Sequence, residues 1–243
     1  MPISFISCAF GYRRGSPVFT DLSFRLPEGR TVLLGPNGAG KSTLLGLAAS
    51  LHFPSAGAVA YKGLDPRRRR DRASYRRLVG WMPQDIRPVP GLTVREQIGY
   101  AGWLKGMSRR EAWRRSADAL DAVALGPLAG RRCGQLSGGQ LRRVGLAQAL
   151  VHDAEVILLD EPTAGLDPGQ RERFRQVVTR LGGRHLVVST HQTEDLGDLY
   201  ESVVVLDGGT VKYAGSTAEF LALSGDRVPS AEASYALLVA GEA

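Results

Sequence analysis

The chain of 243 residues contains few cysteines and no long apolar run. A membrane-spanning helix needs about 20 consecutive apolar residues, and runs such as 156–159 are far shorter. Residues 1–5 lack the basic leader and apolar core of a signal peptide, so none is expected. Cys8 and Cys133 form no recognisable framework, and we expect two reduced thiols. These absences argue against a disulfide-stapled domain and against a chain that crosses the membrane by itself.

Lysine is also scarce, because 27 of the 31 basic residues are arginine, and the net charge is +7. The densest basic run lies at 67–77. Such a run is compatible with a solvated face, with anionic lipid headgroups or an acidic partner, or with nucleic acid. No groove-reading motif or interleaved aromatic stripe accompanies the charge, so no nucleic-acid partner is expected.

Apolar periodicity divides the chain into three parts. Short strands are expected before residue 34, a hairpin strand at 56–64 and a helix in the arginine-rich stretch that ends at Leu78. From residue 155 onward, strands alternate with helices. A short helix is expected at 230–238, within a loose tail. This order predicts an α/β fold with a mostly parallel sheet and helices on both of its faces.

The middle part, from about 92 to 150, reads as helices only. Thr93 with Glu96, and Ser108 with Glu111, have the spacing of a capping box at a helix start. A third helix is expected after Ser137. We therefore expect a helical subdomain inserted between two strand-rich parts.

A glycine-rich loop follows the apolar strand at 31–34 and precedes a helix at 41–48. Its sequence fits the phosphate-binding pattern G-x-x-x-x-G-K-[ST]. Glycines let successive backbone N–H groups point at phosphate oxygens, and the helix start adds a positive dipole end. The lysine can reach the β- and γ-phosphates, and the serine hydroxyl can ligate Mg²⁺. The predicted nucleotide-binding residues are Gly35, Pro36, Asn37, Gly38, Ala39, Gly40, Lys41, Ser42 and Thr43.

Two carboxylates follow the apolar strand at 156–159. Asp160 ends this strand, where a carboxylate can hold Mg²⁺ beside the phosphate loop. Glu161 comes next, and because side chains alternate along a strand, we expect a different task for it.

A second glycine-rich element begins the helix of residues 137–150. It reads Leu136, Ser137, Gly138, Gly139, Gln140. A serine and two glycines at a helix N-terminus form an anion site. The chain is thus predicted to hold two phosphate sites.

These segments together resemble the ATP-binding cassette (ABC) family over residues 4–224. The resemblance implies a P-loop NTPase core with an N-terminal antiparallel β subdomain and an inserted α-helical subdomain. It also implies an ABC ATP-binding domain at 1–224 with a tail at 225–243. ATP and Mg²⁺ are the cofactors it implies. In this family the signature of one subunit, here 136–140, closes over the γ-phosphate on the loop of a second subunit, and we expect a homodimer.

The same resemblance assigns roles to single residues. Glu161 corresponds to the general base that polarises the attacking water, and His191 to the switch histidine. Gln84 corresponds to the glutamine that senses Mg²⁺ and the γ-phosphate, and Asp167 to the loop that crosses the dimer interface. Tyr12 corresponds to the aromatic residue that stacks on adenine, with Phe10 as the competing choice. The other histidines, His52, His152 and His185, are expected to be non-catalytic.

The resemblance implies the ATPase subunit of a transporter, with separate integral membrane permease subunits and a position on the cytoplasmic face of the membrane. Residues 92–106 and 190–195 resemble cassettes that serve drug, antibiotic, peptide or sodium exporters, so export is expected. One alternative is a soluble ABC ATPase that acts on ribosomes, DNA or protein assembly. Ribosome-acting members generally carry two cassettes, whereas this sequence shows one. DNA-repair members carry a long coiled coil, and this sequence shows no sustained heptads. A nucleotide-gated regulatory module is a third alternative, against which Glu161 and His191 argue.

Overall fold

The computed structural model describes residues 2–13, 15–196, 199–225 and 230–239. It divides into two compact units, which are described separately. Unit 1 comprises Met1–Tyr75 and His185–Ala243, and unit 2 comprises Arg76–Arg184. In the part of the chain that is described, no helix is long and apolar enough to cross a membrane.

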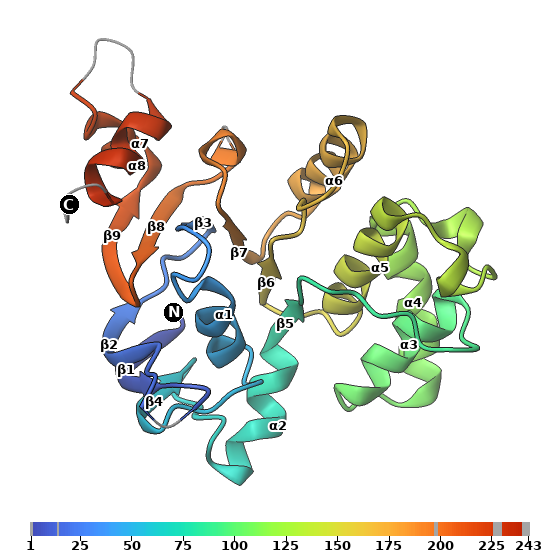
Figure 1. Ribbon diagram of the computed structural model, residues 1–243. Coiled ribbons are helices and arrows are strands. Elements are labelled where there is room, and N and C mark those ends of the chain that lie inside the picture. The colour runs from blue at the N-terminus through green and yellow to red at the C-terminus, as the bar shows by residue number, and fades with distance from the viewer. Residues whose placement is uncertain (1, 14, 197–198, 226–229, 240–243) are drawn as a thin grey trace. The chain divides into compact units, whose positions relative to one another are not determined.

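Unit 1 begins with an antiparallel sheet of three strands in the order β2-β1-β4 (Figure 1). These strands are β1 (Ser4–Phe10), β2 (Phe19–Arg25) and β4 (Ala56–Ala60). The rings of Phe5 and Phe24 stack between β1 and β2 with centroids 5.0 Å apart. The strand predicted at 56–64 is shorter, because residues 61–64 close a tight turn in which Lys62 and Gly63 have positive φ. It pairs with β1 instead of forming a local hairpin.

A second sheet in unit 1 contains the parallel strands β7 (His185–Thr190), β3 (Arg30–Leu34) and β8 (Ser202–Asp207). Val32, Leu33, Val203 and Val204 are fully buried there. Burial on both faces explains why these strands read as continuous apolar runs and do not alternate. β3 leads through the glycine loop into α1 (Lys41–Ala48).

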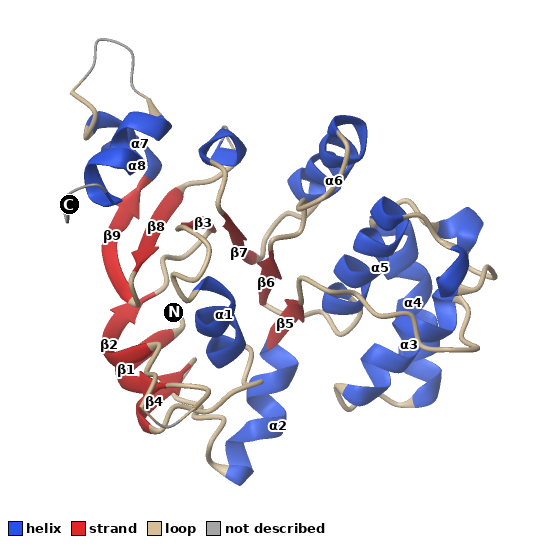
Figure 2. Cartoon of the chain, viewed as in Figure 1, coloured by secondary structure: helices blue, strands red, loops and turns tan. Residues whose placement is uncertain are grey.

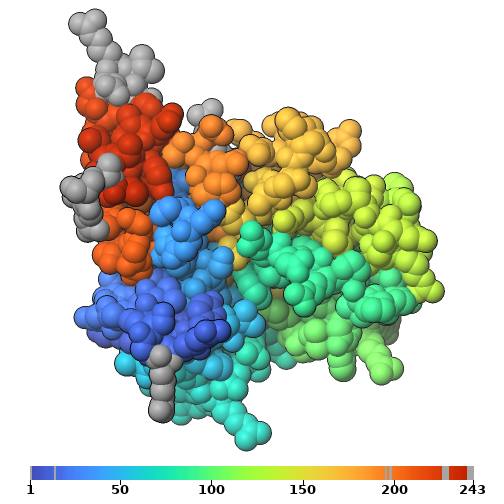
Figure 3. All heavy atoms as spheres, in the orientation of Figure 1, coloured from blue at the N-terminus to red at the C-terminus, as the bar shows by residue number. Residues whose placement is uncertain are grey.

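Two elements after β8 were not predicted from the sequence. β9 (Thr210–Ser216) pairs antiparallel with β8, and a capping box of Ser216 with Glu219 begins α7 (Thr217–Ala222). β9 also packs beside β2, and Figure 3 shows the orange-red segment against the blue strands. The helix predicted in the tail is confirmed as α8 (Ala231–Val239). The rest of that tail, 226–229 and 240–243, lies outside the described residues.

Unit 2 contains two parallel strands and four long helices (Figure 2). The strands are β5 (Val79–Met82) and β6 (Val156–Asp160). The helices are α3 (Val94–Leu104), α4 (Arg109–Ala122), α5 (Gly138–Leu150) and α6 (Pro168–Arg180). The arginine-rich helix α2 (Arg69–Leu78) precedes β5, as predicted. The described residues also form short 3-10 turns: η1 (Gly126–Leu128), η2 (Cys133–Gln135) and, in unit 1, η3 (Thr193–Leu196).

The two predicted capping boxes behave differently. At α3 the box is complete, because Thr93 accepts from the Glu96 backbone and Glu96 accepts from the Thr93 backbone. At α4 only half of it forms. Ser108 accepts from the backbone of Glu111, whose carboxylate instead binds Arg114 and Arg115. A competing guanidinium thus prevents the second half of the box.

Candidate functional site

The glycine loop in unit 1 adopts a backbone that only glycine accommodates easily. Gly38 and Gly40 have φ of 87° and 103°, a region that disfavours side chains. A Cβ on Gly35 would lie 2.2 Å from the carbonyl oxygen of Leu206. The turn after β8 also holds the loop, because the backbone N–H of Gly209 donates to Ala39. The loop is therefore tightly constrained by its neighbours in unit 1.

Gly40 is the N-cap of α1 and offers no side chain to cap the helix. The first N–H groups of a helix have no partner within the helix, so this end attracts anions. Lys41 is buried, and its ammonium donates to the carbonyl oxygens of Gly35 and Pro36 at 2.6 Å and 3.1 Å. Ser42, in the first turn of α1, is exposed. This geometry provides a cationic, N–H-rich cradle suited to phosphate.

Tyr12 lies beside this loop with an exposed ring. Its hydroxyl is 3.1 Å from the Thr43 hydroxyl, and the residue is 62% exposed. Phe10 and His52 contact it edge-on or nearly so, with centroids 5.1 Å and 5.4 Å away. A cavity of about 630 Å³ is lined by both Phe10 and Tyr12. The exposed ring of Tyr12 leaves a face free for stacking, whereas Phe10 is half-buried.

His191 follows the last residue of β7. The register pairs Thr190 with Leu34, the last residue of β3. His191 and Gly35 therefore leave neighbouring strands at the same edge of the sheet. The His191 side chain is exposed, so it is available at the edge where ligands bind in parallel sheets.

In unit 2, Asp160 ends β6 and Glu161 follows it, and both residues are buried. Glu161 has a φ of 45° and is already outside the strand. The alternation argued from the sequence therefore does not set its direction. A non-glycine residue in this region costs about 1 kcal/mol or more. The surrounding structure thus imposes the turn that aims this carboxylate.

Gln84 and Asp160 are brought to one edge of unit 2. β5 pairs with β6 so that Met82 lies opposite Leu159, and Gln84 follows two residues later. The Gln84 side chain is exposed, and the backbone carbonyl oxygen of this residue accepts from Arg142 on α5.

The second glycine element forms the start of α5. Ser137 is the N-cap and forms a complete capping box with Gln140. Gly138 is exposed, whereas Gly139 is buried against Gln170, where a Cβ would lie 2.5 Å from the side-chain oxygen. The Ser137 side chain and the first helical N–H groups therefore lie at an accessible helix end, which suits an anion.

Asp167 is the N-cap of α6, and its carboxylate accepts from the backbone N–H of Gln170 at 2.9 Å. The structure thus gives it a local capping task. Arg142, by contrast, was not singled out from the sequence. An arginine within a helix matches no motif, so no sequence pattern indicated that Arg142 contacts two loops.

The family of ABC transporters matches residues 19–164. The chain belongs to this family. As an ABC protein it has the P-loop NTPase fold of ATP-binding cassettes, with a mixed, mostly parallel sheet. It is the ATP-binding subunit of an ABC transporter and an ATPase, as the sequence predicted.

Relatives of this ABC subunit include both importers and exporters. The nickel import ATP-binding protein NikO of Rhodobacter capsulatus is 40% identical over 227 residues, which cover 88% of each chain. The Nod factor export ATP-binding protein I of Burkholderia lata is 39% identical over 197 residues, covering 79% of this chain and 64% of that protein. The direction of transport therefore does not follow from these similarities.

A solved ABC cassette has the same fold. The dimeric post-hydrolysis structure of an ATP-binding cassette bound to ADP and Pi has a TM-score of 0.76. It is 27% identical, and the match covers 88% of this chain and 98% of that one.

Proposed function

We propose that this chain couples ATP-driven head-to-tail dimerisation to substrate movement through separate membrane subunits. The observation that carries the proposal is the presence of two glycine-containing helix starts on one chain. One begins α1 in unit 1 and the other begins α5 in unit 2. Each of these helix starts suits a phosphate. In a head-to-tail dimer, the phosphate loop of one chain faces the α5 start of the other, so that one nucleotide contacts both. The dimeric state of the solved relative supports this arrangement.

The tasks that we propose for single residues rest on the resemblance to the ABC family and are supported by the positions described above. Lys41 and the loop N–H groups bind the phosphates, and Tyr12 stacks on the adenine. Glu161 orients and deprotonates the attacking water, and His191 contacts the γ-phosphate. Asp167 supports the dimer contact through the loop before α6.

We also propose, from the resemblance to the ABC family, that a magnesium ion arrives with the nucleotide. No group of three or more His, Cys, Asp or Glu able to hold a metal exists among them. Mg²⁺ usually needs no such cage, because it keeps waters and takes one or two protein ligands plus phosphate oxygens. We propose Ser42, Gln84 and Asp160 as its protein ligands. The ion neutralises charge on the transferred phosphate.

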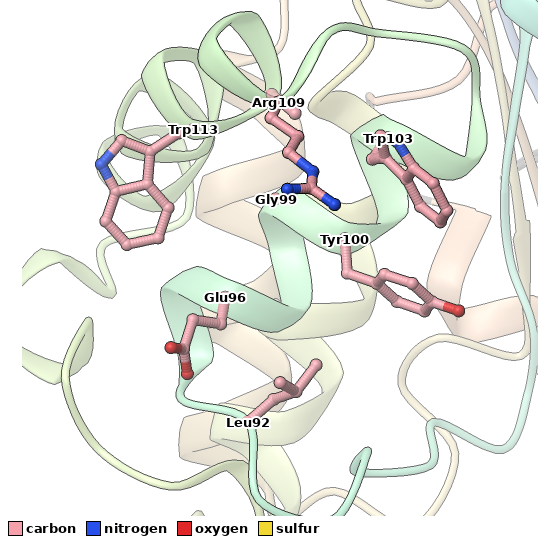
Figure 4. A pocket seen from close by; sticks show the side chains of 8 residues that line it. Leu92, Glu96, Gly99, Tyr100, Trp103, Arg109 and Trp113 are labelled. Atoms are coloured by element: carbon pink, nitrogen blue, oxygen red, sulfur yellow. The ribbon is translucent and has the colours of Figure 1, made fainter.

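An exposed aromatic surface on unit 2 is a candidate docking site for a protein partner. Tyr100 and Trp103 of α3 and Trp113 of α4 are each between 43% and 48% exposed. They line a pocket of about 380 Å³ together with Arg109 (Figure 4). Exposed aromatics around one arginine are typical of interaction sites. We propose that a cytoplasmic segment of the membrane subunit docks there, which would hold the chain at the cytoplasmic face of the membrane.

Export remains our proposal for the direction. It rests on the resemblance of residues 92–106 and 190–195 to exporter cassettes and on the Nod factor exporter among the relatives. The nickel importer argues for the other direction. Substrate uptake and release, measured in vesicles that contain the complete transporter, decide between them.

Co-purification from native membranes tests the proposed function. A tagged chain in mild detergent should bring down a polytopic membrane protein at stoichiometric level. Trp103→Ala should reduce that recovery, whereas Leu237→Ala, which removes an exposed apolar side chain from α8, should not. Recovery only from the soluble fraction, with ribosomes, DNA or an assembly scaffold, would instead support the soluble ABC ATPase.

A further inference from the structure

Two successive arginines on α5 make contacts of different kinds. Arg142 donates from one guanidinium nitrogen to the carbonyl oxygen of Gln84 and from the other to that of Ala164, the latter at 3.3 Å. Arg143 donates to the carbonyl oxygens of Val123 and Ala124, both at 3.1 Å. Arg143 thus holds the C-terminal end of α4. Arg142 instead links the α5 helix to two loops that carry proposed catalytic residues.

Two glycines on α5 let the helix approach the Gln84 loop and the start of α6 closely. A Cβ on Gly145 would lie 2.4 Å from the side chain of Ile86, two residues after Gln84. A Cβ on Gly139 would meet Gln170, at the start of α6. Residues three apart on a helix share a face, so Gly139, Arg142 and Gly145 form one row. This row faces the Gln84 loop and the segment that follows Glu161.

The surroundings of Arg142 also place it near the proposed reaction centre. Burial lowers the pKa of its guanidinium, while Asp85, Asp160 and Glu161 act in the opposite direction. The half-buried guanidinium of Arg142 therefore interacts electrostatically with both Asp160 and Glu161.

We propose that Arg142 is a positioning residue for ATP hydrolysis, which fixes the backbone of the Gln84 loop and of the loop after Glu161 to α5. The inference rests on the proposed roles of Gln84 and Glu161. Two bonds from one planar guanidinium constrain both loops at once. Because α5 begins at Ser137, the same arginine passes a displacement of the signature segment to the loop beside the general base. Loss of Arg142 leaves nucleotide binding by the phosphate loop intact and misaligns the hydrolytic residues.

Steady-state ATPase measurements on the purified full chain test this inference, with turnover expressed per bound nucleotide. For Arg142→Ala we expect kcat to fall by about 10-fold to 100-fold, since small misplacements of catalytic groups have effects of this size. The KM for ATP should stay within about twofold. The kcat of Arg142→Lys should lie between those of wild type and Arg142→Ala, because the lysine ammonium keeps the charge but lacks the planar guanidinium fork. Addition of ethylguanidinium should partly restore turnover to Arg142→Ala.

Arg143→Ala is the matched control. It should lower the midpoint of thermal unfolding but leave kcat per bound nucleotide within about twofold, with no rescue by ethylguanidinium. Equal losses of kcat in both alanine variants, or wild-type kcat in Arg142→Ala, would overturn the inference. If Arg142→Ala does not fold, wild-type kcat in Arg142→Lys would overturn it.

Glu161→Gln, measured in parallel, separates the positioning role of Arg142 from the proposed base role of Glu161. An inactive Glu161→Gln with active Arg142 variants would refute only the positioning role. A fully active Glu161→Gln would refute the proposed base, on which the inference depends.

Discussion

At the scale of single residues, the proposed site depends on the buried Lys41, on the left-handed turn at Glu161 and on the contacts of Arg142. The spacing of residues 35–42 predicted a phosphate loop, and the structure shows the strand, loop and helix this motif needs. The sequence contained no signal for the left-handed backbone of Glu161. It also did not reveal the contacts of Arg142, because its partners are carbonyl oxygens, which any residue supplies.

Lys41→Ala tests the phosphate loop. The ammonium is the buried cation of the loop, and losing such a group typically lowers turnover by about 100-fold or more. Titration with a fluorescent ATP analogue and phosphate release should both show the loss. Lys62→Ala, which changes an exposed lysine of unit 1, should behave like wild type. Normal ATP turnover by Lys41→Ala would refute the loop assignment.

At the scale of elements, periodicity and capping signals identified most helices and strands. The antiparallel β9 and the short α7 were missed, because an edge strand with half-buried residues and a six-residue helix carry weak periodic signals. The pairing of β4 with β1 was also out of reach, since the partner lies about 50 residues away in sequence. The spacing predicted a capping box at α4, but the Glu111 carboxylate binds Arg114 and Arg115, so only half of the box forms.

Ser137→Arg tests the α5 start as a second phosphate site. In a Glu161→Gln background, it should spare ATP binding by the monomer and block ATP-dependent association, because the bulky side chain fills the anion site. Loss of the cap alone costs about 1 kcal/mol. Ser108→Arg is the control, since the Ser108 side chain also caps a helix, α4, through a backbone N–H. Equal loss of association in both variants, or weaker ATP binding by the Ser137→Arg monomer, would argue against a site that acts on another subunit.

His152, just after α5, predicts a dependence of stability on pH. Burial lowers the pKa of His152 to about 4, and nearby Lys105 acts in the same direction, while Val79 and Asp153 oppose them. An unfolded histidine titrates near 6.5, so the unfolded chain binds more protons between pH 4 and 6.5. The free energy of unfolding should therefore decrease as the pH falls through this window, by about 1–2 kcal/mol at pH 5 from this residue.

Denaturant unfolding of wild type and His152→Gln at several pH values checks this. The wild type should lose stability relative to the variant as the pH falls from 7.5 to 5. If the free energies of unfolding of the two proteins changed in parallel with pH, His152 would have the same pKa in the folded and the unfolded chain.

At the scale of the whole molecule, each unit holds part of the proposed machinery. Unit 1 carries the phosphate loop, Tyr12 and His191, and unit 2 carries Gln84, Glu161 and the signature segment. The sequence predicted the family and its ATPase activity because these rest on short contiguous motifs. The transported substrate could not be predicted, and the predicted export stays a proposal, since the proposed function assigns both to a complex with membrane subunits.

The central claim is that ATP joins two copies of this chain and that hydrolysis separates them. Glu161→Gln should bind ATP, hydrolyse it very slowly and accumulate in the joined state. Light scattering during size-exclusion chromatography of this variant measures its mass directly. Our account predicts that saturating Mg-ATP shifts the mass from the 26.1 kDa of one chain to twice that value. A mass that stays at 26.1 kDa with ATP bound would contradict it.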